Sequence, residues 1–220
     1  MSFRVNIERT KELASREYDI SAEEVRELII LTKGLFDNLL QVAGKSPAKI
    51  KALTTKFRDA GRRSAPWKPT SSRVPGRPQD GADGNRIRRW DLPADHKFYA
   101  NEISATLVEV KYYFQALSFL NSPPLPDEKL KHSFYWLLRH DIIPGAYTDP
   151  LQLIPVDLDK VLEAPTTIQS GHIVPLDRGG KHSPKNTSLM LKESNSLQGN
   201  MTIEELLNFM KEILHRHEMC

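Results

Sequence analysis

Residues 170–180 read SGHIVPLDRGG, a short β-type run that carries His172, stops at a proline and opens into a loop ending in two glycines. A lone histidine on a strand is more often structural than chemical, so the neighbouring segments must decide its role. A second strand candidate, TSLMLK, follows at 187–192. Thr202 and Glu205 then form a capping box ahead of the helical pattern IEELLNFMKEILHRH. Residues 170–217 are therefore predicted to form strand, long loop, strand and helix.

The part of the chain before residue 140 indicates helices instead. Ser21 and Glu24 form another capping box, and apolar residues then recur at helical spacing to about Val42. SPAKIKALTTKFRDAGRR (46–63) predicts a second, basic helix, and further helices are expected over about 95–120 and over 127–140. We therefore expect an α+β protein with a mostly helical region over 1–140 and a second unit over 141–220.

Composition restricts the class of protein. The charged fraction of 27% and hydrophobic fraction of 39% are those of a globular chain, and no apolar run approaches the roughly 18 residues that span a bilayer. The first residues are charged and lack the apolar core of a signal peptide. Cys220 is the single cysteine, which excludes a disulfide framework and a cysteine-based structural zinc site. We expect a cytoplasmic protein in a reducing compartment, with no membrane partner.

Positive charge is concentrated in one segment. Residues 45–89 hold thirteen Lys/Arg and three Asp, which leaves eighteen Lys/Arg and twenty-five Asp/Glu in the rest of the chain. Within it, residues 64–89 are rich in proline and glycine and predict a long irregular loop. Such a loop either contacts a polyanion or is a solvated linker. The first alternative makes its basic residues candidate phosphate contacts, with Trp67 and Trp90 available for stacking: Arg62, Arg63, Lys68, Arg73, Arg77, Arg86, Arg88 and Arg89.

Three polar residues recur in order along the strand–loop–strand–helix segment. Asn186 lies 14 residues after His172, and Asn195 lies nine residues further on. With GHIVPL, GG, KNTSLMLKESN and QGN, this segment resembles the HNH nucleases, also called the ββα-metal fold, over about residues 165–217. The resemblance implies that His172 is the general base, that Asn186 braces the loop beside it, and that Asn195 binds a divalent metal. Helix N-capping is the alternative role for Asn195.

These residue types suit hydrolysis of a phosphodiester. A neutral imidazole with a pKa near ~6.5 accepts the proton of an attacking water at neutral pH, provided that its other ring nitrogen is held. A hard divalent ion neutralises the charge that develops on the phosphate and the leaving oxygen. Mg²⁺, or another divalent metal such as Mn²⁺, is therefore the expected cofactor, with asparagine, phosphate and water as ligands.

The segment departs from the commonest pattern of the family immediately before the base. Many members have a metal-binding Asp or His there, and this chain has Gly171. The substitute ligands that the sequence offers are Asp177, His182, Gln198 and Asn200. Arg178, Lys181 and Gln198 are further candidates for DNA contact, and His182 for either a metal or a phosphate.

The resemblance implies a metal-dependent DNA endonuclease that acts on double-stranded DNA. A large additional region is typical of restriction endonucleases, and cutting both strands of a symmetric site would call for a homodimer. Two alternatives stay open: a homing, phage nicking or nonspecific nuclease of the same family, and a nucleic-acid-binding protein whose nuclease unit has lost activity.

Overall fold

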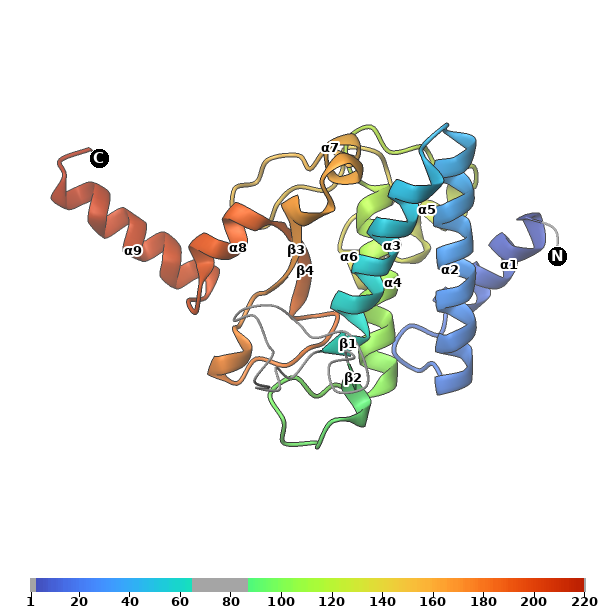
Figure 1. Ribbon diagram of the computed structural model, residues 1–220, viewed down its shortest axis with the longest axis horizontal. Helices are drawn as coiled ribbons and strands as arrows, with labels where there is room; N and C mark the ends of the chain where they lie inside the picture. The colour runs from blue at the N-terminus through green and yellow to red at the C-terminus, as the bar shows by residue number, and fades with distance from the viewer. Residues whose placement is uncertain (1–2, 65–86, 220) are drawn as a thin grey trace, which may run out of the picture.

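The computed structural model describes residues 3–64 and 87–219 of the chain. Its body is helical: α2 (Ala22–Val42) and α3 (Pro47–Gly61) pack against α4 (Glu102–Leu117), and α1 (Phe3–Ala14) packs on α2 (Figure 1). Residues 105–117 of α4 are all buried, as expected for a helix that is covered on every side. α4 is therefore the central element of the protein.

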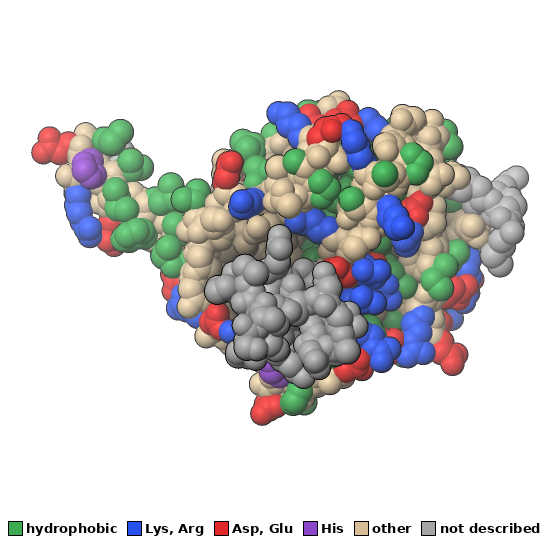
Figure 2. Space-filling view, viewed as in Figure 1, with side chains coloured by type: hydrophobic (Ala, Val, Ile, Leu, Met, Phe, Trp, Pro, Cys, Tyr) green, Lys and Arg blue, Asp and Glu red, His purple; other side chains and the backbone are tan. Residues whose placement is uncertain are grey.

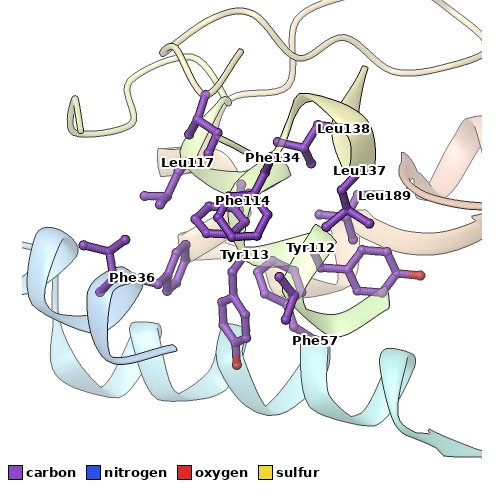
Figure 3. Packing of buried hydrophobic residues seen from close by; sticks show 14 of the residues in the cluster. Phe36, Phe57, Tyr112, Tyr113, Phe114, Leu117, Phe134, Leu137, Leu138 and Leu189 are labelled. Atoms are coloured by element: carbon purple, nitrogen blue, oxygen red, sulfur yellow. The ribbon is translucent and has the colours of Figure 1, made fainter. Parts of the chain in front are cut away.

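Aromatic side chains fill the contact between these helices. Phe36 of α2, Phe57 of α3 and Tyr113 of α4 are fully buried, and their ring centroids lie 5.2–6.1 Å apart at tilted or edge-on angles (Figure 3). Such arrangements suit the quadrupoles of aromatic rings and add to the free energy of burial. The predicted stripe of α2 is thus core, and its capping box is present, with Ser21 and Glu24 bonded reciprocally.

Two predicted helices differ from the observed ones. The helix expected from about residue 95 begins at Glu102, because the Asn101 side chain accepts a hydrogen bond from the Ser104 amide and caps it there. The helix expected over 127–140 is two short ones, α5 (Glu128–Ser133) and α6 (Tyr135–Leu138). Phe134 separates them, and its buried ring lies 4.1 Å from that of Phe114.

The two strands expected in the second half of the chain are confirmed. β3 (Ile168–His172) and β4 (Thr187–Leu191) form an antiparallel hairpin, with Ile168 opposite Leu191 and His172 opposite Thr187. The remaining elements are β1 (Arg63–Ser64), which pairs with β2 (Ile87–Arg88), and η1 (Arg89–Asp91), α7 (Leu158–Glu163), η2 (Pro165–Thr167), η3 (Leu176–Arg178), α8 (Lys192–Gln198) and α9 (Ile203–Arg216).

The hairpin lies against α4 through polar contacts as well as apolar ones. Lys111, which is 7% exposed, donates hydrogen bonds to the carbonyls of Pro184 (2.8 Å) and Thr187 (2.7 Å). Burial lowers the pKa of this lysine to about 8. One hydrophobic cluster contains residues on both sides of residue 140, from Ile7 to Leu189. The predicted division of the chain into residues 1–140 and 141–220 therefore stays a prediction.

α9 extends away from the body (Figure 1). It begins with the predicted capping box of Thr202 and Glu205, and Leu206 is its only buried residue. None of the helices in the described ranges is long and apolar enough to cross a membrane.

Candidate nuclease site

The three residues of the family pattern gather where β3 ends. His172 is the last residue of β3, Asn186 directly precedes β4, and Asn195 lies on α8. α8 is joined to the strand by its own side chains: Asn195 Nδ2 donates to Gln169 Oε1 (2.8 Å), and Gln198 Nε2 donates to the His172 carbonyl (2.7 Å). The hairpin and the helix therefore form one local unit around the end of β3.

Asn186 closes the loop that follows His172. Its Oδ1 accepts a hydrogen bond from the Val174 amide (2.8 Å), and its Nδ2 donates to the carbonyls of Val174 and Lys181 (2.9 Å each). The loop is tight at Gly180, where a Cβ atom would lie 2.0 Å from the Val174 carbonyl oxygen. Gly179 has φ +83°, a conformation that favours glycine. Asn186 thus braces the loop, and a direct catalytic role for it stays a prediction.

A chain of hydrogen bonds determines which nitrogen of His172 carries a proton. The Gly61 carbonyl at the end of α3 can only accept, so the His182 Nε2, 2.8 Å away, is the donor. In neutral His182 the Nδ1 is then an acceptor, and it lies 3.1 Å from His172 Nε2. His172 Nε2 therefore donates, and its Nδ1 has a lone pair. No described residue hydrogen-bonds to that Nδ1.

The surroundings keep both imidazoles neutral. Burial, with the positive charge of Arg89 nearby, lowers the pKa of His172 to about 4 and that of His182 well below its usual 6.5. Both rings are thus uncharged at neutral pH, which is the protonation state assumed in the hydrogen-bond chain. His172 is only partly buried, whereas His182 is 1% exposed.

The side chain of Met190 occupies the space beside Gly171, where the family's second metal ligand was expected. A Cβ atom at Gly171 would lie 2.0 Å from Sδ of Met190 and 3.4 Å from Oδ1 of Asn195. The Met190 side chain thus fills the space where the family's carboxylate or imidazole would begin. On the far side of it, the Asn195 amide is oriented by its bond to Gln169, and its Oδ1 has no hydrogen bond from the described residues.

α8 is held at its start by a residue that the sequence pattern did not single out. Asp149 is fully buried, and its carboxylate accepts hydrogen bonds from the Leu191 amide (2.8 Å) and the Ser194 hydroxyl (2.7 Å). These contacts fix the turn from β4 into α8 and hence the position of Asn195. Nothing in the local sequence indicates this contact, because Asp149 lies more than 40 residues away in a loop.

Of the four substitute metal ligands suggested by the sequence, Asn200 is exposed after α8 and stays a prediction, whereas contacts within the protein engage the other three. His182 as a ligand is wrong in this structure, because both of its ring nitrogens are hydrogen-bonded. Gln198 is 2% exposed and its amide is directed at backbone carbonyls. Asp177 is exposed and paired with Lys97 at 2.7 Å. The described ranges contain no group of three or more His, Cys, Asp or Glu residues that could hold a metal, and the ligand role of Asn195 stays a prediction.

Several predicted DNA contacts are structural residues. Arg89 is 7% exposed and donates to the carbonyls of Gly61, Phe98 and Ala60, and Gln198 is buried as described. Arg62 is paired with the buried carboxylate of Glu109. Burial keeps Arg89 and Gln198 away from DNA in this structure, whereas Arg62 is partly exposed and its DNA contact stays a prediction.

Other basic candidates remain accessible. Arg88 is exposed, pairs with Asp91 and lies over the Trp90 ring; Arg178 is exposed and pairs with Glu205; Lys181 is exposed and Arg63 is partly exposed. Lys181 also lines a cleft of about 470 Å³ between residues 94–104 and residues 176–183. Lys68, Arg73, Arg77, Arg86 and Trp67 lie outside the described residues.

Comparison with known proteins gives limited information. No family model matches the chain, and no curated protein matches it. A solved structure described as "Crystal structure of a type II restriction endonuclease" is similar, with a TM-score of 0.47 and 21% sequence identity. The similarity covers 61% of this chain and 63% of that chain, so the matched part is less than two thirds of that structure. The functional proposal therefore rests on the residues of the site.

Proposed function

We propose that this protein is a DNA endonuclease of the HNH type, which hydrolyses a phosphodiester bond with His172 as general base. The observation that carries the proposal is the state of His172: a neutral ring, held through Nε2, with the Nδ1 lone pair unengaged by the described residues. This is the arrangement that general-base catalysis requires. The resemblance of the surrounding segment to HNH nucleases supplies the substrate class.

In the proposed reaction, His172 Nδ1 accepts a proton from a water molecule as the water oxygen forms a bond to phosphorus. The bond between phosphorus and the leaving 3′ oxygen breaks, and that oxygen takes its proton from solvent. Asn186 keeps the loop beside His172 in place through its bonds to Val174 and Lys181. Lys181, exposed on that loop, is placed to contact the DNA backbone.

The site suits a divalent metal only if the DNA phosphate and water supply most of its ligands. Among the described residues, Oδ1 of Asn195 is the oxygen beside the Gly171 position, and Met190 fills the place of a second ligand there. Mg²⁺ keeps several waters and is often bound together with substrate phosphates, so an amide, a phosphate and water suit it or Mn²⁺. Such an ion would neutralise negative charge on the phosphate and on the leaving oxygen.

A restriction role is the setting we propose first, with a homodimer for cutting both strands. A second candidate function is supported by one observation. Because Met190 occupies the position of the second ligand beside Gly171, a nucleic-acid-binding protein without cleavage activity also fits the site.

The deciding experiment is digestion of plasmid DNA in Mg²⁺ and in Mn²⁺ by the wild type, His172→Ala and His215→Ala. His215 is exposed on α9 and serves as the matched control. We expect cleavage by the wild type and by His215→Ala, and loss of cleavage in His172→Ala. Discrete fragments with defined ends support restriction, and a smear supports a nonspecific nuclease. DNA binding without cutting in either metal overturns the nuclease proposal in favour of the binding protein.

A further inference from the structure

The segment around His182 is held at several points, although it lies in a loop. The Lys181 carbonyl accepts from Asn186, the Ser183 carbonyl accepts from the Thr187 hydroxyl (2.9 Å), and the Pro184 carbonyl accepts from Lys111 (2.8 Å). The backbone on both sides of His182 is thus fixed to the hairpin and to α4. A histidine that is 1% exposed and held in this way has little freedom to rotate.

The other end of the hydrogen-bond chain is equally constrained. At Gly61 a Cβ atom would lie 2.8–2.9 Å from Glu109 of α4, so this close contact between helices requires glycine. The Gly61 carbonyl also accepts a hydrogen bond from Nε of Arg89 (3.1 Å). The acceptor for His182 is therefore a rigid point of the helical body, 121 residues away in the sequence.

We propose that His182 is a positioning residue, which fixes the tautomer and ring orientation of His172 by accepting its Nε2–H while donating to the Gly61 carbonyl. This rests on the proposed function of His172. The helical region then contributes to catalysis, because the Gly61 carbonyl at the end of α3 is the fixed acceptor of the hydrogen bonds that lead to His172. His182 Nδ1 must be an acceptor for this role, and the bond from Nε2–H to the Gly61 carbonyl selects the His182 tautomer in which Nδ1 is one.

Two nearly isosteric substitutions separate these roles. His182→Asn keeps a carbonyl oxygen near the position of Nδ1 and so can still accept from His172. His182→Gln carries its amide near the position of Nε2, so it can donate to Gly61 but lacks the acceptor for His172. Both variants remain polar and similar in size, and thermal unfolding reports whether each is folded.

We expect kcat for plasmid cleavage to fall roughly 10- to 100-fold in His182→Gln, with KM unchanged, and to stay within a few-fold of wild type in His182→Asn. Equal kcat in the wild type and His182→Gln would overturn the proposal. A fall in kcat that is the same in both variants would also overturn it, because it would indicate a merely structural role.

A second measurement does not depend on activity. Nitrogen NMR of the DNA-free wild type at neutral pH should show His172 protonated at Nε2, with that proton exchanging slowly with water. His182→Asn should retain the slow exchange and His182→Gln should lose it. A wild-type His172 protonated at Nδ1 overturns the positioning role. Slow exchange in a protein that cuts no DNA would instead retain the positioning role and reject the nuclease function.

A different surface carries a second inference, which is independent of the nuclease. On α9, five exposed side chains follow the helical spacing, and the helix contacts the body only near its start (Figure 2). They are Leu207 (49% exposed), Phe209 (48%), Met210 (42%), Ile213 (36%) and Leu214 (39%). Positions three, four and seven apart lie on one face of a helix, so this is an apolar face without a partner among the described residues.

The charges beside this face identify its partner. α9 is acidic in its first turn, with Glu204 and Glu205, and basic in its last, with His215 and Arg216. Glu204 and Lys211 are seven residues apart and share one flank. Two copies packed antiparallel would place Glu204 of each beside Lys211 of the other, and would also oppose their helix dipoles.

We infer that α9 pairs with α9 of a second copy of this chain in an antiparallel, two-fold arrangement. Because a helix of 14 residues buries less surface than a standard interface, a weak dimer is expected. The symmetry is isologous, so each charged pair occurs twice and charge changes have doubled effects.

Sedimentation equilibrium at 10–100 µM, at low salt, tests this inference with charge exchange. We expect Glu204→Lys and Lys211→Glu each to weaken dimerisation at least 10-fold, and the double exchange to restore it. Leu207→Glu, at the centre of this register, should abolish the dimer without lowering the thermal midpoint. A monomeric wild type overturns the inference, and so does a double exchange no better than either single one. Binding of a monomeric wild type to anionic vesicles would assign the face to lipid instead.

Discussion

Gly171 and His172 are neighbours in the chain, yet their side-chain positions face different parts of the protein. Adjacent residues of a strand point to opposite faces. The Gly171 position faces Met190 and Asn195, and the His172 ring faces His182. On one face of the strand, His182 holds the proposed base, His172. On the other face, the Met190 side chain fills part of the space beside Gly171.

The space beside Gly171 predicts the effect of restoring the family's ligand. Gly171→Asp should lower stability by about 1–3 kcal/mol, because its Cβ would overlap the Met190 side chain. Adding Met190→Ala should recover part of that loss and should tighten Mn²⁺ binding, as a carboxylate then lies beside Asn195. Thermal unfolding and calorimetric Mn²⁺ titration measure the two effects. A fully stable single variant would contradict the overlap.

The lowered pKa values of His172 and His182 predict how stability depends on pH. The unfolded histidines titrate near ~6.5, whereas the folded pKa of His172 is about 4 and that of His182 is also lowered. Below pH 6.5 the unfolded chain therefore binds more protons, and stability falls as the pH drops from about 6.5 toward 4.

For His172 alone, the expected loss at pH 5 is about 2 kcal/mol relative to pH 7.5. Urea unfolding at the two pH values measures it, and His172→Gln serves as the control because it should reduce the difference. Equal stability of the wild type at both pH values would refute the neutral, buried histidines.

At the scale of elements, the β3–β4 hairpin depends on side chains that bond to its loop. Asn186→Ala removes three hydrogen bonds at once, one from Val174 N–H and two to the carbonyls of Val174 and Lys181. We expect a loss of about 1–3 kcal/mol and faster hydrogen exchange at the Val174 amide. Asn200→Ala, an exposed change after α8, is the control. Unchanged exchange at Val174 would show that the loop is held by other contacts.

At the scale of the whole molecule, replacing a buried basic residue should change stability, and replacing an exposed one should change DNA binding. Arg89→Met should lower the thermal midpoint, because the carbonyls of Ala60 and Phe98 lose this donor and the Gly61 carbonyl keeps only its bond from His182. Lys181→Ala should leave the midpoint unchanged and weaken DNA binding, with the slope of log K against log salt reduced by about 0.9 per lost phosphate contact. Thermal unfolding and salt-dependent binding to duplex DNA separate the two. If Lys181→Ala binds DNA with the wild-type salt slope, this loop does not contact phosphate.

Local signals in the sequence were sufficient for the longer helices and for the strands of the hairpin. The two capping boxes, the stripe of α2 and the strands at 168–172 and 187–191 follow from bonds or spacings within a few residues. The start of α4 at Glu102 and the break at Phe134 were predicted wrongly. The cap at Asn101 competes with a longer helix, and burial of the Phe134 ring overrides the helical pattern around it.

The sequence by itself determined the main helices, the two strands of the hairpin, and the identity of His172, Asn186 and Asn195 as the residues to follow, since these depend on spacing along the chain. Only the tertiary structure decided what surrounds them. Gly61, Arg89 and Asp149 lie far from the hairpin in sequence, so no local pattern indicates that they hold His182 and α8. The physical reason is that hydrogen bonding and burial depend on distance in space, and the fold alone brings these groups together.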